Sequence, residues 1–218
     1  MITEERIAAY INSLEKELSP QLSKLEEEAK VNAVPIIRKE TQGVIRFLLS
    51  LQKPRNILEV GTAIGFSALF MSEHSPKDCR ITTIEKVEMR LVEARRNFKD
   101  QVFPHRQKIS LKEGEALKIL KELVEADEKY DFIFLDAAKA QYMNFLPQLI
   151  KLIDEAGLLI TDNVLQDGTV INSRYSISRR DRTIHTRMRD YLYTITHMDE
   201  LETLILPVGD GIALSFKL

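Results

Sequence analysis

Two apolar stretches of the sequence end in side chains whose oxygen atoms are suited to binding a metal ion. Asp136 ends the stretch DFIFLD, and Asp162 and Asn163 follow the stretch GLLIT. Because the carboxyl ends of neighbouring parallel strands meet at one edge of a sheet, we expect these three side chains to lie close together. Carboxylate and amide oxygens are hard ligands that suit Mg²⁺. The alternative is that Asp162 and Asn163 only cap a turn, as Asp and Asn often do.

A lysine follows the first of these strand ends. Lys139 comes three residues after Asp136, near the start of the next helix-like stretch. In a closed site beside a metal, a lysine gives up its proton more readily than in water and can act as a base. Lys139 is therefore the candidate catalytic base.

A glycine-containing turn lies earlier in the chain, in the sequence Glu59-Val-Gly61-Thr-Ala-Ile-Gly65-Phe-Ser67. It follows a strand-like run and opens a helix-like one, which is where open α/β sheets bind ligands. The spacing is G-x-x-x-G, which differs from the dinucleotide pattern G-x-G-x-x-G, and no phosphate-binding Lys-Ser/Thr follows. A nucleoside-type cofactor suits such a turn, although a plain strand-to-helix turn with packing glycines would look the same.

Three acidic residues lie within, at the end of or just after the strand-like runs and have a candidate role beside this turn. Glu85 comes about 20 residues after the turn, where a carboxylate can bind both ribose hydroxyls. Glu59 lies within an apolar strand, where an unpaired carboxylate is costly and a cationic partner is favoured. Glu115 and Ala116 begin the helix after the third strand and are placed to contact an adenine edge. For Glu85 a solvated strand end, and for Glu115 a simple helix-start acid, are the alternatives.

Residues 174–190 are rich in arginine. Six arginines stand against two aspartates, a net charge of +4 from 6 − 2; the arginines are Arg174, Arg179, Arg180, Arg182, Arg187 and Arg189. Guanidinium groups suit phosphates, and the flanking Tyr175 and Tyr191 suit unstacked bases. The segment is a candidate single-stranded RNA-binding surface, and a solvated charged helix is the alternative.

Strand-like and helix-like patterns alternate from Asn56 onward. The apolar runs NILEV, ITTIE, KISLK, DFIFLD and GLLITD are separated by helix-like patterns over 65–74, 87–100, 115–125 and 140–153. This alternation predicts a Rossmann-like, doubly wound α/β sheet. LETLILP and GIALSFKL, with Gly209-Asp210-Gly211 between them, predict a hairpin. The sheet should therefore have about seven mostly parallel strands and an antiparallel C-terminal pair at one edge.

The residues before the sheet predict an N-terminal helical extension over 1–54. Apolar residues recur there at three-to-four spacing, Ser19-Pro20 interrupts the pattern, and a further helical stretch opens at Pro35. We expect residues 1–218 to form a single domain, with 55–218 as its Rossmann-like core.

Composition narrows the choice of function. The chain has 218 residues, 31 Lys and Arg, 33 Asp and Glu, and a formal net charge of −2, which excludes a generally basic nucleic-acid-binding protein. Cys79 is the only cysteine, so no internal disulfide and no cysteine-based zinc site is expected. No apolar run has the length of a membrane span, and the N-terminus does not have a signal-peptide pattern. We expect a cytoplasmic protein.

Taken together, these motifs resemble the class I S-adenosylmethionine (SAM)-dependent O-methyltransferases. The stretches LEVGTAIGFSA, TIE, FIFLDAAKAQY and ITDNVL, in this order, are similar to the metal-dependent group with catechol and caffeoyl-CoA O-methyltransferases. Within it, PIIRKE, DAAKAQYMNF, the arginine-rich stretch and PVGDGIALS resemble the bacterial tRNA 5-hydroxyuridine methyltransferases most closely.

The resemblance implies a role for each candidate residue. Cofactor contacts would come from Ile37, Glu59, Gly61, Ser67, Glu85, Glu115, Ala116 and Asp136. Glu59, Gly61 and Ser67 would hold the amino-acid part of SAM. Asp136, Asp162 and Asn163 would bind Mg²⁺, and Lys139 would be the catalytic lysine. Members of the group commonly dimerise, so a homodimer is expected. Glu115 is a mild departure, since family members often have Asp-Ala where this chain has Glu115-Ala116.

These observations lead to one expected function and two competing ones. The leading hypothesis is Mg²⁺-dependent methylation of 5-hydroxyuridine at the tRNA wobble position to 5-methoxyuridine, with Arg174, Arg179, Arg180 and Arg182 contacting the anticodon loop. The runner-up is methylation of small catechol-like phenols. A nucleotide-binding or dehydrogenase-like protein is the third, and the missing G-x-G-x-x-G argues against it.

Overall fold

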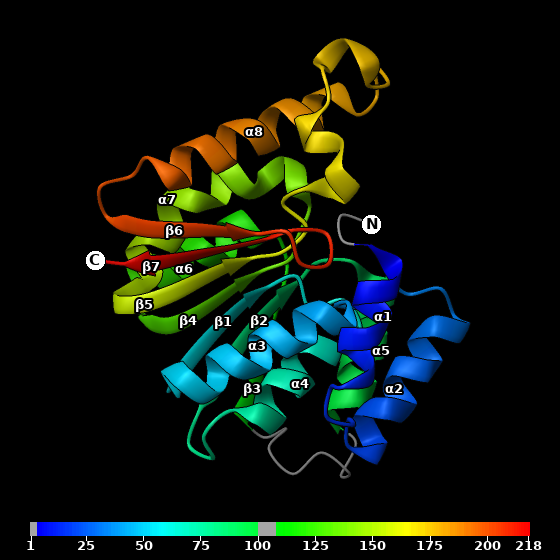
Figure 1. Ribbon diagram of the computed structural model, residues 1–218. Coiled ribbons are helices and arrows are strands. Elements are labelled where there is room, and N and C mark those ends of the chain that lie inside the picture. The colour runs from blue at the N-terminus through cyan, green and yellow to red at the C-terminus, as the bar shows by residue number, and fades with distance from the viewer. Residues whose placement is uncertain (1–3, 100–107) are drawn as a thin grey trace.

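A computed structural model describes residues 4–99 and 108–218, and it contains one seven-stranded sheet (Figure 1). The strand order is β3-β2-β1-β4-β5-β7-β6. The strands are β1 (Asn56–Val60), β2 (Arg80–Glu85), β3 (Ile109–Glu113), β4 (Tyr130–Leu135), β5 (Ile153–Thr161), β6 (Leu201–Leu206) and β7 (Ile212–Lys217). The first five pair in parallel, and β7 alone runs against its neighbours β5 and β6. The predicted α/β class, strand number and C-terminal hairpin are confirmed.

Helices cover both faces of this sheet. They are α1 (Glu5–Ser13), α2 (Pro20–Val31), α3 (Lys39–Gln52), α4 (Phe66–His74), α5 (Glu88–Lys99), α6 (Ala116–Glu125), α7 (Tyr142–Leu152) and α8 (Arg182–Thr196), with short 3-10 helices η2 (Lys139–Gln141), η3 (Gln166–Ile171) and η4 (Arg174–Ser176). Figure 1 shows α6, α7 and α8 on one side of the sheet and α2, α3 and α4 on the other.

The alternation of side chains along each strand explains why the central strands are apolar throughout. In β4, Ile133 and Leu135 pack with α6 and α7, whereas Phe132 and Phe134 pack with α2, α3 and α4. All four side chains are fully buried. Because both faces are covered, the run FIFL has no polar position, as expected for a parallel sheet enclosed by helices.

The structure differs from the sequence prediction at several boundaries. Strand β5 begins at Ile153, four residues before the predicted GLLITD run, so α7 ends at Leu152. Residues 34–38 form neither helix nor strand, and α3 begins at Lys39 rather than at Pro35. Arg38, the residue before α3, has an extended backbone (φ −64°, ψ 157°), so the helix starts only after it. The last residue of the predicted helix over 87–100 lies outside the described residues.

Three predictions concern the chain as a whole: the lack of a membrane span, the homodimer and the single domain. Within the described ranges, no helix has both the length and the apolar character required to cross a bilayer. Several apolar side chains of α1 and α3 are exposed, including Tyr10, Ile11, Phe47 and Leu51. The homodimer and the single-domain division at residue 54 stay predictions.

Candidate active site

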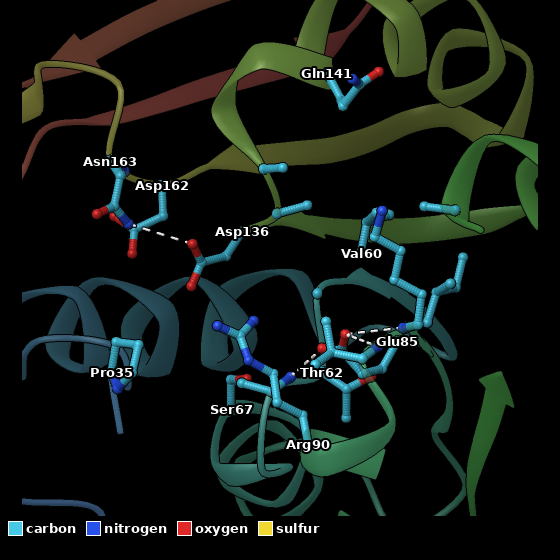
Figure 2. A pocket seen from close by; sticks show the side chains of 18 of the residues that line it. Pro35, Val60, Thr62, Ser67, Glu85, Arg90, Asp136, Gln141, Asp162 and Asn163 are labelled. Atoms are coloured by element: carbon cyan, nitrogen blue, oxygen red, sulfur yellow. Dashed lines mark hydrogen bonds between the residues drawn. The ribbon is translucent and has the colours of Figure 1, made fainter. Parts of the chain in front are cut away.

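A cavity of about 790 Å³ lies at the carboxyl ends of the parallel strands, and Figure 2 shows its lining side chains. It opens beside β1 and β4, where the strand order reverses direction along the sheet. Open α/β sheets bind their ligands at this position. The wall includes the turn after β1, the ends of β2, β3, β4 and β5, and residues 35–38 of the extended N-terminal segment. Apart from Glu59 and Lys139, all the predicted cofactor and metal residues line this cavity.

The turn after β1 is packed tightly against the ends of two neighbouring strands. Gly61 has φ +109°, and a Cβ there would lie 2.0 Å from the main-chain oxygen of Asp136. The amides of Gly61 and Thr62 both donate to the carbonyl of Ile84, at 3.1 and 3.2 Å. Glycine at position 61 is therefore needed for this close approach. Ser67 lies in the first turn of α4, is largely buried, and lines the cavity.

Glu59 lies beneath this turn and is fully buried. Thr83 donates a hydrogen bond to its Oε2, whereas Oε1 has no hydrogen-bond partner among the described residues. Burial raises the pKa of Glu59 to about 7, against the opposing effect of the Ser67 and Thr83 hydroxyls. An unsatisfied buried carboxylate oxygen is costly, so it fits a site that receives a cationic group. Glu59 is not itself among the described residues lining the cavity, and a direct contact with a cofactor stays a prediction.

Glu85, at the end of β2, links the loop after β2 to the turn after β1. Its carboxylate accepts hydrogen bonds from the backbone amides of Ala63, Lys86 and Val87, at 2.8–2.9 Å. It is 6% exposed and lines the cavity. These hydrogen bonds orient the carboxylate towards the glycine turn. Oε1 already accepts two of the amides and Oε2 accepts one, so Oε2 keeps acceptor capacity for a ribose hydroxyl.

Glu115 and Ala116 form the opposite rim. Ala116 begins α6, and Glu115 precedes it as the N-cap residue without a capping side-chain bond. The Glu115 carboxylate instead pairs with Lys86 Nζ at 3.1 Å, and the two side chains are 70% and 56% exposed. The pair bridges the loops after β2 and β3 at the cavity mouth. A solvated ion pair of this kind contributes little to stability.

The three candidate metal ligands lie at the ends of the neighbouring strands β4 and β5. Asn163 Nδ2 lies 3.4 Å from Asp136 Oδ1, and Asp162 Oδ1 accepts the amide of Asn163 at 2.8 Å. Asp162 is 3% exposed. Burial raises the pKa of both aspartates, and the charge of Asp136 raises that of Asp162 further. Among the described residues, no three His, Cys, Asp or Glu side chains converge on one point. The donor set is two carboxylates and an amide, which fits a hard divalent cation with water and acceptor oxygens completing its coordination.

Lys139 does not line the larger cavity but lies beside a second, smaller one. It begins η2, and it lines a second cavity of about 320 Å³ together with residues of η3 and α8. Asp210, in the turn between β6 and β7, lines both cavities and therefore marks their junction. The ammonium of Lys139 is close enough to the metal-ligand set to oppose the rise in the pKa of Asp136 and Asp162.

The arginines of the basic segment fall into two groups. Three bind main-chain carbonyls: Arg182 that of Ile177, Arg187 that of Ala140 and Arg189 that of Val170. Arg179 and Arg180 are exposed and, within the described part of the chain, have no hydrogen bond or ion pair. The side chain of Arg174 lies outside the described residues. Only part of the predicted RNA-binding set is therefore available to a ligand without breaking an internal bond.

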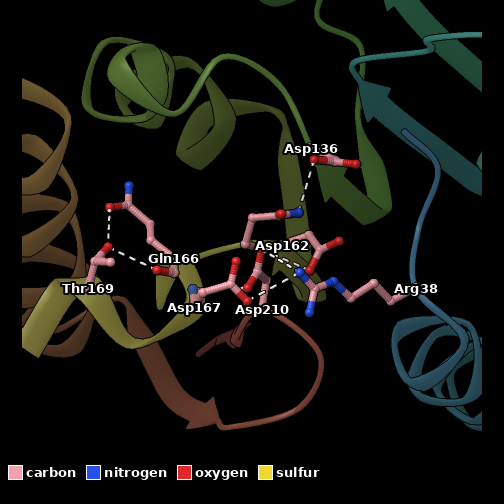
Figure 3. A network of polar contacts seen from close by, with 8 residues as sticks. Arg38, Asp136, Asp162, Gln166, Asp167, Thr169 and Asp210 are labelled. Atoms are coloured by element: carbon pink, nitrogen blue, oxygen red, sulfur yellow. Dashed lines mark hydrogen bonds and ion pairs between the residues drawn. The ribbon is translucent and has the colours of Figure 1, made fainter. Parts of the chain in front are cut away.

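Sequence reasoning missed a polar network on the other side of the metal-ligand set (Figure 3). Arg38 Nη2 pairs with Asp167 Oδ1 at 3.3 Å and with Asp210 Oδ2 at 3.2 Å. Ile37, one of the predicted cofactor contacts, precedes Arg38, lines the larger cavity and is buried. The turn sequence Gly209-Asp210-Gly211 was the available signal for Asp210. No local pattern indicates that Arg38 pairs with it.

Comparison with known proteins agrees with this geometry. The sequence pattern of the family described as "O-methyltransferase" matches residues 7–218. A caffeoyl-CoA O-methyltransferase of Medicago sativa is 31% identical over 185 residues, covering 78% of this chain and 70% of the relative. The crystal structure of a putative caffeoyl-CoA O-methyltransferase from Staphylococcus aureus is 34% identical, with a TM-score of 0.87, covering 96% of this chain and 98% of that one.

A more distant structure shares the fold alone. It is the O-methyltransferase from Bacillus cereus in complex with SAH, at 23% identity, a TM-score of 0.85 and full coverage of both chains. Since the family pattern spans almost the whole sequence and is joined by relatives above 30% identity, the chain belongs to the O-methyltransferase family that includes the caffeoyl-CoA O-methyltransferases.

Proposed function

We propose that this chain transfers the methyl group of SAM to one of two adjacent oxygens of an acceptor held beside a divalent cation. Family membership makes the chain a SAM-dependent O-methyltransferase; the metal and the acceptor are the proposal. One observation supports it most directly. Two carboxylates and an amide from the ends of adjacent strands β4 and β5 meet at the edge of the cavity (Figure 2).

On the cofactor side, the residues of the larger cavity have complementary roles. When bound, SAM supplies an electrophilic methyl group on a sulfonium. Ser67 and the amides around Gly61 would hold its amino-acid part, with Glu59 beneath them supplying negative charge. Glu85 would accept hydrogen bonds from the ribose hydroxyls, and Glu115 and Ala116 would border the adenine. Fixing the methyl group towards Asp136 would set the line of the displacement.

On the acceptor side, the chain's residues would orient the oxygen nucleophile and receive its proton. When bound at Asp136, Asp162 and Asn163, a cation such as Mg²⁺ supplies positive charge that favours a deprotonated acceptor hydroxyl. Lys139, facing the second cavity, would take that proton at Nζ. The acceptor would need two vicinal oxygens: one reacts with the methyl group, and the other helps the cation to orient the acceptor.

The relatives favour a small catechol-like phenol as the acceptor. Several of them are caffeoyl-CoA O-methyltransferases by name, at 30–32% identity. A phenol with adjacent hydroxyls satisfies the two-oxygen requirement. This acceptor has better support from the comparisons than the tRNA acceptor predicted from the arginine-rich segment.

The tRNA acceptor has one specific observation in its favour. Arg179 and Arg180 are exposed and unpaired within the described residues, and the segment that carries them continues into Asp181 and Ile184, which line the cavity of Lys139. The 5-hydroxyl and 4-carbonyl of 5-hydroxyuracil are also vicinal oxygens. A wobble base displaced from an anticodon loop would then reach the metal while these arginines contact neighbouring phosphates. If tRNA is the acceptor, the protein would act in the cytoplasm.

A direct assay separates the two acceptors and tests the metal. The purified protein is given SAM with either a catechol or tRNA that contains 5-hydroxyuridine, in the presence of Mg²⁺ or of EDTA. We expect methylation to be lost with EDTA and regained with Mg²⁺; full activity in the chelator would contradict the metal-dependent reaction.

A double variant then identifies the acceptor surface. Arg179→Gln/Arg180→Gln should weaken tRNA methylation at least tenfold and leave catechol turnover unchanged if tRNA is the acceptor. Lys24→Gln/Lys121→Gln removes two exposed positive charges elsewhere and is the matched control. Turnover of the catechol alone, with no methylation of tRNA, would establish the phenol.

A further inference from the structure

The loop that carries the candidate metal ligand Asn163 has an unfavourable backbone. Asn163, Gln166 and Asp167 have φ values of +61°, +51° and +52°, and Gly168 follows at +83°. A left-handed backbone costs Gln166 about 1 kcal/mol or more, whereas Asn163 and Asp167 tolerate it better. A run of four positive-φ residues within residues 163–168 still persists only where the surroundings hold it, so the position of Asn163 depends on neighbouring contacts.

The turn between β6 and β7 supplies most of those contacts. Asp210 accepts the amide of Leu165 with its main-chain oxygen and the amide of Asp167 with Oδ1, both at 2.9 Å. Gly211 accepts the amide of Val164, also at 2.9 Å. A Cβ on Gly211 would lie 2.7 Å from the Leu165 nitrogen, so the turn lies directly against the loop. Three successive anchors hold residues 164, 165 and 167.

Arg38 fixes the same turn and the same loop from the N-terminal side. Its Nη2 lies between Asp167 Oδ1 and Asp210 Oδ2, and the Asp210 side chain is only 10% exposed (Figure 3). The charge of Asp210 also raises the pKa of Asp162. Arg38 offsets the charges of Asp167 and Asp210. It lines the larger cavity together with the preceding residues 35–37.

We infer that Arg38 and Asp210 are positioning residues that hold the loop after β5 in its unfavourable conformation, and so keep Asp162 and Asn163 arranged to bind the cation. This inference rests on the metal site of the proposed function. It also makes the N-terminal segment part of the metal site. Residues 35–38 line the cofactor cavity, and the guanidinium of Arg38 pairs with Asp167 in the loop after β5. Outer partners of metal ligands commonly control affinity in this way.

The test measures metal binding directly, with Mn²⁺ as a paramagnetic probe and far-UV circular dichroism as the measure of an intact fold. Arg38→Gln and Asp210→Asn should weaken Mn²⁺ binding by about 10–100-fold, with the circular dichroism spectrum unchanged. Arg38→Lys keeps a positive charge but cannot bridge both carboxylates in the same way, so it should recover part of the loss. Arg96→Gln is the matched control, since Arg96 also bridges two carboxylates from different elements, Glu28 and Glu93, and lines neither cavity.

The outcomes separate the two proposals. If the unaltered protein does not bind Mn²⁺, the proposed metal site is wrong. If it binds Mn²⁺ and the Arg38 and Asp210 variants bind equally well, the positioning role is wrong while the metal site stands. Should Arg38→Gln fail to fold, the comparison is made with Asp210→Asn and Arg38→Lys, and unchanged Mn²⁺ affinity in both would overturn the inference.

Discussion

At the scale of single residues, Asp162 offers the sharpest test of the metal site. Asp162→Asn removes a charge but keeps the Oδ1 that accepts the Asn163 amide. We expect metal-dependent turnover to fall by about a hundredfold or more, because a hard cation loses one of two anionic ligands. SAH affinity, measured by calorimetry, should change little.

Asp154 provides the matched control for that variant. It lies at the other end of the same strand, and its Oδ1 accepts the amide of the following residue, Glu155, in the same manner. Asp154→Asn should be active. Equal activity of the two variants would show that the Asp162 carboxylate has no role in the reaction.

Glu59 gives a second residue-scale prediction, concerning pH. Its pKa is about 7 in the folded protein against 4.5 ordinarily, so between these values the folded state binds more protons than the unfolded state. The free energy of unfolding of the ligand-free protein should therefore fall as the pH rises from about 5 to about 7.5. Glu59→Gln keeps an acceptor for Thr83 and cannot titrate, so its stability should depend less on pH.

Denaturant unfolding at pH 5 and pH 7.5 measures this difference. Asp136 and Asp162 have pKa values raised by burial and change stability in the same direction, so the variant should show a smaller slope rather than none. Glu202→Gln, at an exposed position on β6, should keep the slope of the unaltered protein. A Glu59→Gln slope equal to that of Glu202→Gln would contradict the raised pKa.

At the scale of elements, the turn after β1 depends on one glycine. Gly61→Ala would place a methyl group 2.0 Å from a main-chain oxygen at the end of β4, which cannot move without shifting the strand. We expect a loss of about 2–4 kcal/mol in the free energy of unfolding and much weaker SAH binding. Gly168→Ala has a comparable φ of +83° but meets no atom within 4 Å, so it should lose only about 1 kcal/mol. Similar losses in the two variants would mean that backbone conformation, not the contact with β4, makes Gly61 necessary.

The same elements show what the sequence can predict. Asp136 and Asp162 follow apolar runs whose alternation identifies parallel strands, and parallel strand ends meet at one edge, so their proximity follows from local pattern. The Arg38–Asp210 pair joins the two ends of the chain, and no local periodicity encodes it. The arginine-rich sequence predicted a basic surface, but not which arginines bind main-chain carbonyls and which are exposed. Arg187 and Arg189 bind the carbonyls of Ala140 and Val170, and only the fold brings these groups together. Lys139 was placed near the metal from its spacing, yet its cavity is built by the distant helix α8.

At the scale of the whole molecule, charge is distributed unevenly around a near-neutral total. The net charge is −2, while residues 174–190 carry +4 and the first thirty residues carry −3, from four basic and seven acidic side chains. In Figure 1, α1 and α2 lie on the opposite side of the sheet from α8. A polyanion would therefore meet attraction at one face and repulsion at the other, which favours a local contact over binding along its length.

This distribution predicts how activity responds to salt. If tRNA is the acceptor, its KM should rise between 50 and 300 mM KCl. In a plot of log KM against log salt, each phosphate contacted on a single strand adds about 0.7 to the slope, and we expect the slope for two or three phosphates. kcat should stay constant, because the metal and cofactor contacts lie inside the cavities. Arg179→Gln/Arg180→Gln should lower the slope by about one to one and a half, and Lys24→Gln/Lys121→Gln should leave it unchanged. Catechol turnover by the same protein should not depend on salt, since that acceptor has no phosphate.

Two results would contradict this prediction. A tRNA slope unaffected by the arginine variant would place the RNA contact elsewhere on the molecule. A catechol KM as salt-dependent as that of tRNA would show that the basic segment acts through general charge rather than through a phosphate contact.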